Sequence, residues 1–186
     1  MILGDNFFHG QGFSTLLIES HQNFTTGACV HTYQVDDPSR YGVAEVKNGK
    51  IVSVVEKPTA FISNFAITGM YSFDGTVSER ARKLKPSPRN ETEIVDLIRS
   101  YIDDNSLENL HLGRGFVWFD VGTPESLLSA SNYVEVIQSR QGTCIASPEE
   151  VAWRMKYISL ENYLKLINAM PNGQYKQMLL KSTTIS

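Results

Sequence analysis

The chain has 186 residues, of which 41% are hydrophobic and 20% charged, a composition typical of a globular protein with one sizeable core. Its 17 basic and 20 acidic residues give a net charge of −3, so no basic surface is expected for nucleic acid. No apolar run approaches the ~20 residues that span a bilayer. The start, residues 1–5, is too short and too soon acidic for a signal peptide. We therefore expect a cytoplasmic protein that binds neither nucleic acid nor a membrane.

The first part of the chain is predicted to be mostly strand. Residues 1–3 are apolar and then meet Gly4 and Asp5, which is how a buried strand ends in a loop. A helix is expected over residues 13–23, where Ser14 can cap its start. The middle two of the strands that follow flank Asn48-Gly49 and are predicted to form a hairpin. The four predicted strands cover residues 28–35, 41–46, 51–55 and 65–73.

The rest of the chain is predicted to be richer in helix. A long helix starts at Thr123-Pro124-Glu125, where threonine caps and proline takes the first helical position, and it reaches about Arg140. From Ser147-Pro148 onward the chain is predicted to be helical throughout. Before these elements come helices over residues 76–84 and 91–103 and strands over residues 107–112 and 116–119. This order predicts an α/β mixed sheet with a β-hairpin insertion in a domain of residues 1–142, and a helical tail over residues 143–186.

Two aspartates each follow a predicted strand. Asp5 comes after residues 1–3, and Asp120 comes after the aromatic strand 116–119. In open α/β sheets, ligands bind beyond the carboxyl ends of the strands. Two such carboxylates can share one Mg²⁺, which takes its other ligands from phosphates and water. The alternatives are a simple turn at Asp5 and a helix cap at Asp120, although Thr123 already fills the capping position.

A third motif places an acid beside a base, Glu56 and Lys57, after the strand 51–55. Because neighbouring side chains on a strand face opposite sides, we expect these two not to pair with each other. One is suited to hydrogen-bond sugar hydroxyls and the other to meet a phosphate, and the alternative is a solvated strand end. Gly42 and Gly69 lie within strand contexts, where glycine marks either a bulge or the close approach of a ligand.

Taken in order, these motifs and several others carry a resemblance to one family. The motifs are Leu3-Gly4-Asp5-Asn6, Asp37-Pro38-Ser39-Arg40-Tyr41-Gly42-Val43, Glu56-Lys57-Pro58, Ala66-Ile67-Thr68-Gly69-Met70-Tyr71, Glu91-Thr92-Glu93-Ile94-Val95-Asp96, Gly113-Arg114-Gly115-Phe116-Val117-Trp118-Phe119-Asp120-Val121-Gly122-Thr123 and Ser147-Pro148-Glu149-Glu150. Over nearly its whole length, the chain resembles the glucose-1-phosphate thymidylyltransferases of the sugar-1-phosphate nucleotidylyltransferase family. The resemblance implies a truncated Rossmann-like nucleotidyltransferase mixed sheet. It also implies an activity that couples dTTP and glucose 1-phosphate to dTDP-glucose and pyrophosphate with Mg²⁺.

The resemblance also assigns roles to individual residues. It implies that Asp5 and Asp120 are the magnesium ligands, and that Lys57 and Arg89 are catalytic residues that meet the sugar phosphate. It implies a second, regulatory nucleotide site near a subunit interface. The sugar pocket is implied to contain Tyr41, Gly42, Glu56, Gly69 and Trp118, and the regulatory site Arg114, Glu149 and Glu150.

The chain departs from the family pattern at its front. The family opens with a strand and a Gly-Thr-Arg loop that wraps the triphosphate, whereas the Gly-rich residues 9–12 contain no arginine. We therefore expect the carboxyl-terminal portion of such an enzyme, acting as a non-catalytic module that binds a sugar phosphate or nucleotide sugar, or that serves assembly. The alternatives are a half-enzyme that is active only with a separate amino-terminal partner, and an inert remnant. An exposed strand edge at the front predicts a homo-oligomer or association with a full-length relative.

Overall fold

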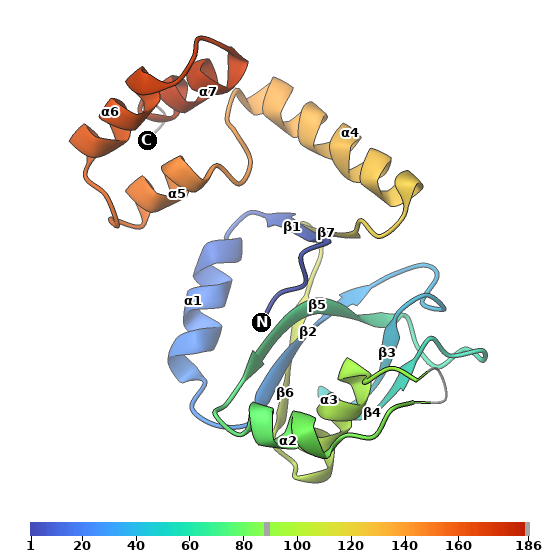
Figure 1. The fold of residues 1–186 in the computed structure, drawn as a ribbon. Coiled ribbons are helices and arrows are strands. Elements are labelled where there is room, and N and C mark those ends of the chain that lie inside the picture. Colours follow the sequence, from blue (N-terminus) through green and yellow to red (C-terminus); the bar gives the residue numbers. More distant parts are fainter. Residues whose placement is uncertain (88–89, 185–186) are drawn as a thin grey trace. The chain divides into compact units, whose positions relative to one another are not determined.

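The computed structural model of the chain describes residues 1–87 and 90–184, without the side chains of His21 and Asn23. The chain divides into two compact units, Met1–Thr123 and Pro124–Ser186, and each is considered by itself (Figure 1). The sequence-based boundary after residue 142 left the long helix Pro124–Gln141 in the first domain, whereas the division in the structure assigns this helix to the second unit.

The first unit is a mixed α/β fold, as predicted. One sheet has five strands in the order β4-β3-β5-β2-β6, and a second sheet pairs β1 with β7. The pair β2 and β6 is parallel, whereas the pairs β2–β5, β3–β4, β3–β5 and β1–β7 are antiparallel. The elements are β1 (Asn6–Gly10), α1 (Phe13–Asn23), β2 (Ala28–Gln34), β3 (Gly42–Lys47), β4 (Lys50–Glu56), β5 (Phe65–Phe73), α2 (Val77–Lys83), α3 (Ile94–Asp103), β6 (Leu107–Leu112) and β7 (Phe116–Asp120).

The predicted hairpin is confirmed. Strands β3 and β4 pair from Gly42↔Glu56 at the open end to Lys47↔Lys50 at the turn. The two turn residues, Asn48 and Gly49, have φ angles of 51° and 77°, which is the left-handed conformation that a two-residue hairpin turn requires. The register of this turn brings Gly42 beside Glu56, and both residues belong to the candidate site described below.

Helix α3 covers one face of the five-stranded sheet (Figure 1). Its buried residues Val95 and Ile98 pack with Val30, Ile67 and Tyr71 from the central strands. The helix predicted over residues 91–103 is confirmed, although it starts three residues later, at Ile94. The start of α3 also borders the candidate site, because Ile94 and Val95 line the same cavity as Gly42 and Ile67.

The prediction of a buried strand at residues 1–3 is wrong. Ile2 forms one isolated antiparallel bridge to Met70. Met1, Ile2 and Leu3 are 61%, 59% and 43% exposed. Among the described strands, this segment has only β5 beside it. The structure instead has a strand that was not predicted, β1, directly after Asp5.

Asp74 joins three parts of the first unit at the end of β5. Its carboxylate accepts hydrogen bonds from the backbone N–H of Gly27 at 2.7 Å, from that of Thr76 at 2.9 Å, and from the Tyr101 hydroxyl at 3.3 Å. Hydrogen bonds from Thr76 and Gly27 hold the pKa of Asp74 at about 2, below its ordinary value of 3.8. A carboxylate with such donors stabilises the folded state only while it is ionised.

We expect this carboxylate to make stability depend on acid pH. Because its pKa is lower in the folded than in the unfolded chain, its contribution is complete above about pH 4 and is lost as the pH falls toward 2. Asp74→Asn should therefore lower the urea midpoint at pH 6, and the gap to wild type should shrink by pH 2.5. Asp103→Asn, at the exposed end of α3, is the control. A gap that stays constant across this range would contradict the assignment.

The second unit is entirely helical among its described residues, as predicted for residues 148 onward. Ser147 and Ser159 accept hydrogen bonds from backbone N–H groups at the starts of α5 and α6, and the helix start predicted at Ser147-Pro148 is confirmed. Tyr163, Ile167 and Leu179 form its buried core, and the Tyr163 ring stacks on Trp153 at 4.9 Å. The helices are α4 (Pro124–Gln141), α5 (Pro148–Arg154), α6 (Leu160–Ala169) and α7 (Gln174–Ser182).

Across residues 1–87 and 90–184, none of the helices combines the length and the apolar character that crossing a membrane requires.

Candidate functional site

A cavity of about 210 Å³ in the first unit gathers residues that are far apart in the sequence. The strand ends of β3, β4 and β7 and the middle of β5 all contribute to its lining. The residues predicted from sequence that line this cavity are Tyr41, Gly42, Glu56, Lys57, Gly69, Trp118 and Asp120. Two further lining residues, Asn6 and Arg40, were not predicted as site residues.

Aromatic rings form one wall of this cavity. Trp118 is only 8% exposed, and its ring centroid lies 5.0 Å from that of Tyr41 and 6.0 Å from that of Tyr33. Burial raises the pKa of the Tyr41 hydroxyl, and the nearby Asp120 carboxylate raises it further. An aromatic wall beside carboxylates is an arrangement that can accept the apolar face of a sugar ring and its hydroxyl groups together.

The prediction that Glu56 and Lys57 do not pair is wrong. The Lys57 ammonium lies 3.8 Å from Oε1 of Glu56. The alternation rule fails here because β4 ends at Glu56 and Lys57 has a φ angle of 42°, outside the extended region. The backbone N–H of Lys57 also donates to the Tyr41 carbonyl at 3.0 Å. Both charged groups line the cavity, so the pair offers a ligand one acceptor and one cation.

Gly42 and Gly69 are sites of close approach. A Cβ atom added to Gly42 would lie 3.0 Å from Cγ2 of Val95 and 3.3 Å from Oε2 of Glu56. A Cβ on Gly69 would lie 2.6 Å from the Asn6 side-chain oxygen, closer than real Cβ contacts. Gly69 also lies in an irregular part of β5, because the β2–β5 register shifts between Val30 and Thr32, opposite residues 68–70. The bulge alternative is therefore supported at Gly69, and the groups that closely approach both glycines are the protein's own side chains rather than a ligand.

The carboxylates of Asp5 and Asp120 both flank Gly122. A Cβ on Gly122 would lie 3.5 Å from Oδ1 of Asp120 and 3.8 Å from Oδ2 of Asp5. Pairing of β1 with β7 sets this arrangement, because Asn6 pairs with Asp120 and the Val121 N–H donates to the Asp5 carbonyl at 2.8 Å. The carboxylates of two residues from distant parts of the sequence therefore both lie within 4 Å of one position beside Gly122, while their role as metal ligands stays a prediction.

This pair of carboxylates fits a Mg²⁺ ion. The described residues include no group of three or more His, Cys, Asp or Glu side chains suited to hold a metal. Mg²⁺ does not need such a cage, because one or two carboxylates suffice when phosphate oxygens and water complete its coordination. Asp5 and Asp120 would therefore hold the ion together with a phosphorylated substrate. Either carboxylate alone would hold it less tightly.

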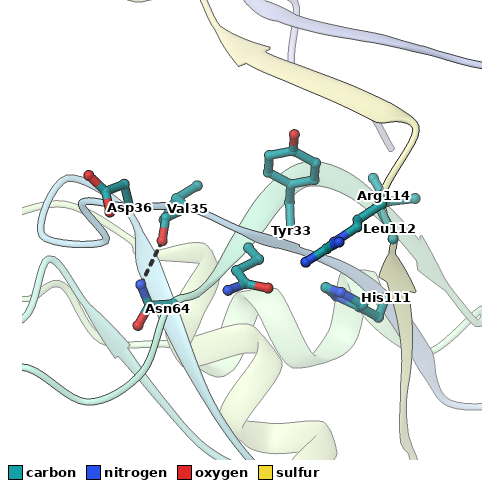
Figure 2. A pocket seen from close by; sticks show the side chains of 9 residues that line it. Tyr33, Val35, Asp36, Asn64, His111, Leu112 and Arg114 are labelled. Carbon is teal, nitrogen blue, oxygen red and sulfur yellow. Dashed lines mark hydrogen bonds between the residues drawn. The ribbon is translucent and has the colours of Figure 1, made fainter.

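Arg114 lies in a different cavity of the first unit, of about 370 Å³. Figure 2 shows Arg114 with His111 and Tyr33 at the end of the parallel pair β2–β6, and Asn64 donating to the Val35 carbonyl at 2.8 Å. This cavity shares none of its lining with the one that contains Trp118. Arg114 is therefore placed apart from the sugar-pocket residues, as a separate site requires.

The remaining predicted residues are Glu149, Glu150 and Arg89. Glu149 and Glu150 begin α5 in the second unit, where Glu149 accepts a hydrogen bond from the Tyr175 hydroxyl at 2.5 Å and Glu150 pairs with Arg154 at 2.8 Å. The Tyr175 hydrogen bond lowers the pKa of Glu149. Arg89 lies outside the described residues. The regulatory role of Glu149 and Glu150 and the catalytic role of Arg89 stay predictions.

Sequence analysis missed Asn6 and Arg40 although both lie inside motifs that carry the resemblance. Arg40 follows a turn in which Asp37 accepts from the Ser39 N–H at 3.0 Å, and this turn aims the chain at Tyr41. Asn6 was named as part of the motif Leu3-Gly4-Asp5-Asn6 but was given no site role of its own. The position of Asn6 next to Asp5 indicated a site residue. Its hydrogen-bond partners come from β5 and β7, however, and the sequence around Asn6 does not reveal them.

Comparisons with known proteins agree with this geometry. The family model described as nucleotidyl transferase matches residues 1–136. The chain is 44% identical to a glucose-1-phosphate thymidylyltransferase of Xanthomonas campestris pv. campestris (strain B100) over 180 residues, covering 96% of this chain and 61% of that protein. It is 45% identical to the enzyme of that name from Neisseria meningitidis serogroup A over 182 residues, covering 97% of this chain and 63% of that protein. The chain thus spans about three fifths of the length of these curated relatives.

Two solved structures are each similar to 71% of the chain. One is a crystal structure of a Bacillus anthracis protein assigned as a glucose-1-phosphate thymidylyltransferase, in complex with a sucrose; it is 38% identical, with a TM-score of 0.63, and covers 71% of this chain and 52% of that one. The other is a UDP-glucose pyrophosphorylase complexed with UDP-glucose, 25% identical, with a TM-score of 0.59 and coverage of 71% and 54%. The chain therefore belongs to the nucleotidyl transferase family, among the sugar nucleotidyltransferases that are similar to glucose-1-phosphate thymidylyltransferase.

Proposed function

We propose that this chain binds glucose 1-phosphate, or the nucleotide sugar made from it, in the cavity lined by Trp118. The observation that carries the proposal is the meeting of Glu56, Lys57 and Trp118 in one cavity. The Glu56 carboxylate accepts hydrogen bonds from sugar hydroxyls, the Lys57 ammonium meets the phosphate as a point charge, and the indole packs on the ring. Similar proteins described as bound to a sucrose and to UDP-glucose support a sugar ligand.

Magnesium belongs to this proposal as the partner of the phosphate. Asp5 and Asp120 would hold the ion, which when bound neutralises phosphate charge and orients the phosphate oxygens. The chain's own residues then do the positioning. Tyr41 and Trp118 exclude water from one face of the sugar. Lys57 follows the last residue of β4, and its ammonium can reach the phosphate. In phosphoryl chemistry of this kind, positioning and charge neutralisation supply most of the rate.

We propose that the 186 residues by themselves bind ligand without turning it over. Among the residues that the structure describes, the cations of the cavity lining are Arg40 and Lys57, and a nucleoside triphosphate has more charge than this pair can neutralise. The second candidate is a nucleotidyltransferase half that becomes active with a separate amino-terminal partner. The structural similarity to a UDP-glucose pyrophosphorylase, of which this chain covers 54%, favours it. Mixing the chain with the amino-terminal part of a relative and measuring pyrophosphate release would decide, since release on mixing would replace the first candidate with the second.

The binding proposal is tested by calorimetry with glucose 1-phosphate in the presence of Mg²⁺. We expect measurable binding, and Lys57→Gln should weaken it by about 10-fold, because a hydrogen bond to a charged group is lost. Lys50→Gln is the matched control, since Lys50 is exposed at the opposite end of the same strand. If wild type gives no heat with glucose 1-phosphate or dTDP-glucose, the proposed function is wrong. Equal weakening by both variants would show that Lys57 has no specific role.

We also propose that the chain self-associates, or associates with a longer relative, through residues 1–3. Ile2 is 59% exposed and Leu3 43% exposed on an edge that pairs only with β5, and exposed apolar strand edges recruit other chains. Sedimentation velocity at micromolar concentration should therefore show a species larger than the 20.9 kDa chain. Ile2→Lys should shift it toward the monomer. A wild-type monomer would contradict this part of the proposal.

A further inference from the structure

One side chain links the sugar wall, the central sheet and a magnesium ligand of the candidate site. The side-chain oxygen of Asn6 accepts two hydrogen bonds, from Nε1 of Trp118 at 2.6 Å and from the Gly69 N–H at 2.9 Å. Its amide nitrogen donates to Oδ1 of Asp5 at 3.0 Å. We propose that Asn6 is a positioning residue, which holds the Trp118 indole and the Asp5 carboxylate in their working orientations at the same time.

The two donors fix the orientation of the Asn6 amide. An amide oxygen has two lone pairs, and here both meet N–H groups that can only donate. A flipped amide would place its NH₂ group against the indole N–H and the Gly69 N–H, where neither contact can form a hydrogen bond. The NH₂ group must therefore face Asp5, so the tryptophan and the aspartate are linked through one rigid planar group.

Trp118 has a strong requirement for this acceptor. The residue is 8% exposed, and a buried indole N–H without an acceptor costs the full desolvation of that group. Its ring contacts Tyr41 at 5.0 Å with an interplanar angle of 54°. A change in the indole tilt would therefore be passed to the second aromatic ring of the cavity wall. Through Trp118, Asn6 controls the shape of the surface that meets the sugar.

Gly69 shows that the protein is built around this amide. A Cβ at position 69 would lie within 2.8 Å of the Asn6 side-chain oxygen, nitrogen and carbon atoms. The amide therefore rests directly on the glycine backbone, and its oxygen bonds to the N–H of that same residue. On the other side, Asn6 pairs with Asp120 across β1 and β7. Its backbone and side chain together reach both proposed magnesium ligands.

The inference is tested in the 186-residue chain by following the two indole N–H signals, those of Trp118 and Trp153, by ¹⁵N-correlated NMR. In Asn6→Leu, which keeps the bulk but removes the acceptor, the Trp118 signal should move upfield while Trp153 stays. Asn6→Asp keeps an acceptor oxygen, and its Trp118 signal should return close to the wild-type position. Asn109→Leu is the matched control, because Asn109 accepts from Thr32 elsewhere in the sheet. It should leave the Trp118 signal unchanged.

Ligand measurements on the same variants test the consequences. Asn6→Leu should weaken Mg²⁺ binding, followed through the Val121 and Gly122 amide signals, by about 10- to 100-fold, as loss of an outer-shell partner does. It should weaken glucose 1-phosphate binding by about 10-fold. An unmoved Trp118 signal, or Mg²⁺ affinity equal to wild type, would overturn the inference. The inference rests on the proposed function, but the indole signals are measured without any sugar. A wild-type chain that binds no sugar phosphate would therefore contradict the proposed function and leave the hydrogen-bonding role of Asn6 to be judged from the indole signals.

Discussion

Gly69→Ala is expected to weaken glucose 1-phosphate binding by about 100-fold, since displacement of site groups by about 1 Å can cost this much. The new methyl group would lie 2.6 Å from the Asn6 side-chain oxygen, so the amide must move. Its hydrogen bonds from the Gly69 N–H and the Trp118 indole would then be lost together. The free energy of unfolding should fall by about 1–3 kcal/mol, which is typical of overpacking a well-packed site. Calorimetry and urea unfolding measure the two effects.

A second substitution separates crowding from lost contacts. Asn6→Ala in the Gly69→Ala background removes the group that the methyl meets, so it should recover most of the stability without recovering sugar binding. Gly75→Ala is the control, because a Cβ there would have no neighbour within 4 Å. Full affinity in Gly69→Ala would mean that the site tolerates movement of Asn6. In that case, the proposed dependence of the cavity on this contact would be wrong.

Local patterns predicted most of the fold. The helix Phe13–Asn23 and the strand Phe65–Phe73 have the predicted bounds, because amphipathic period and β-branched alternation are encoded within each segment. The Asn48-Gly49 turn specified the hairpin for the same reason. Strand β1 was missed because its partner, β7, lies more than a hundred residues away along the chain: Asn6 pairs with Asp120. A five-residue strand whose stability comes from such a partner has no local signature.

The site was predicted as a set of residues but not as a geometry. Motif resemblance named Glu56, Lys57 and Trp118, and the structure places these residues in the lining of one cavity, while their roles toward a ligand stay predictions. The predicted relation between Glu56 and Lys57 was wrong, since it assumed extended backbone at both residues, whereas Lys57 has a φ angle of 42°. The role of Asn6 was invisible for a further reason. A hydrogen-bonding side chain gains its function from the donors around it, and here they come from β5 and β7. Sequence can therefore name the groups of a site more reliably than their partners.

The second large effect is expected at the paired carboxylates. Asp5→Asn and Asp120→Asn should each weaken Mg²⁺-dependent binding of dTDP-glucose by at least about 100-fold, since loss of an outer-shell partner alone costs about 10- to 100-fold. Both carboxylates lie within 4 Å of the position that a Cβ on Gly122 would take. Each would therefore supply one of the two negative charges that the pair offers the ion. The measurement is a titration of dTDP-glucose with and without Mg²⁺, followed by Trp118 fluorescence.

The two variants should differ in the absence of magnesium, and this difference tests the site more sharply than the loss itself. Asp120 lines the sugar cavity, whereas Asp5 lies outside its lining and contacts it through Asn6. Asp120→Asn should therefore also change metal-free sugar binding, and Asp5→Asn should leave it within about twofold, as expected for a remote single contact. Asp36→Asn, in the Arg114 cavity, is the control for lost charge. If either aspartate variant kept the full magnesium effect, the shared-ion site would have to be abandoned, because a single carboxylate of the pair would then suffice.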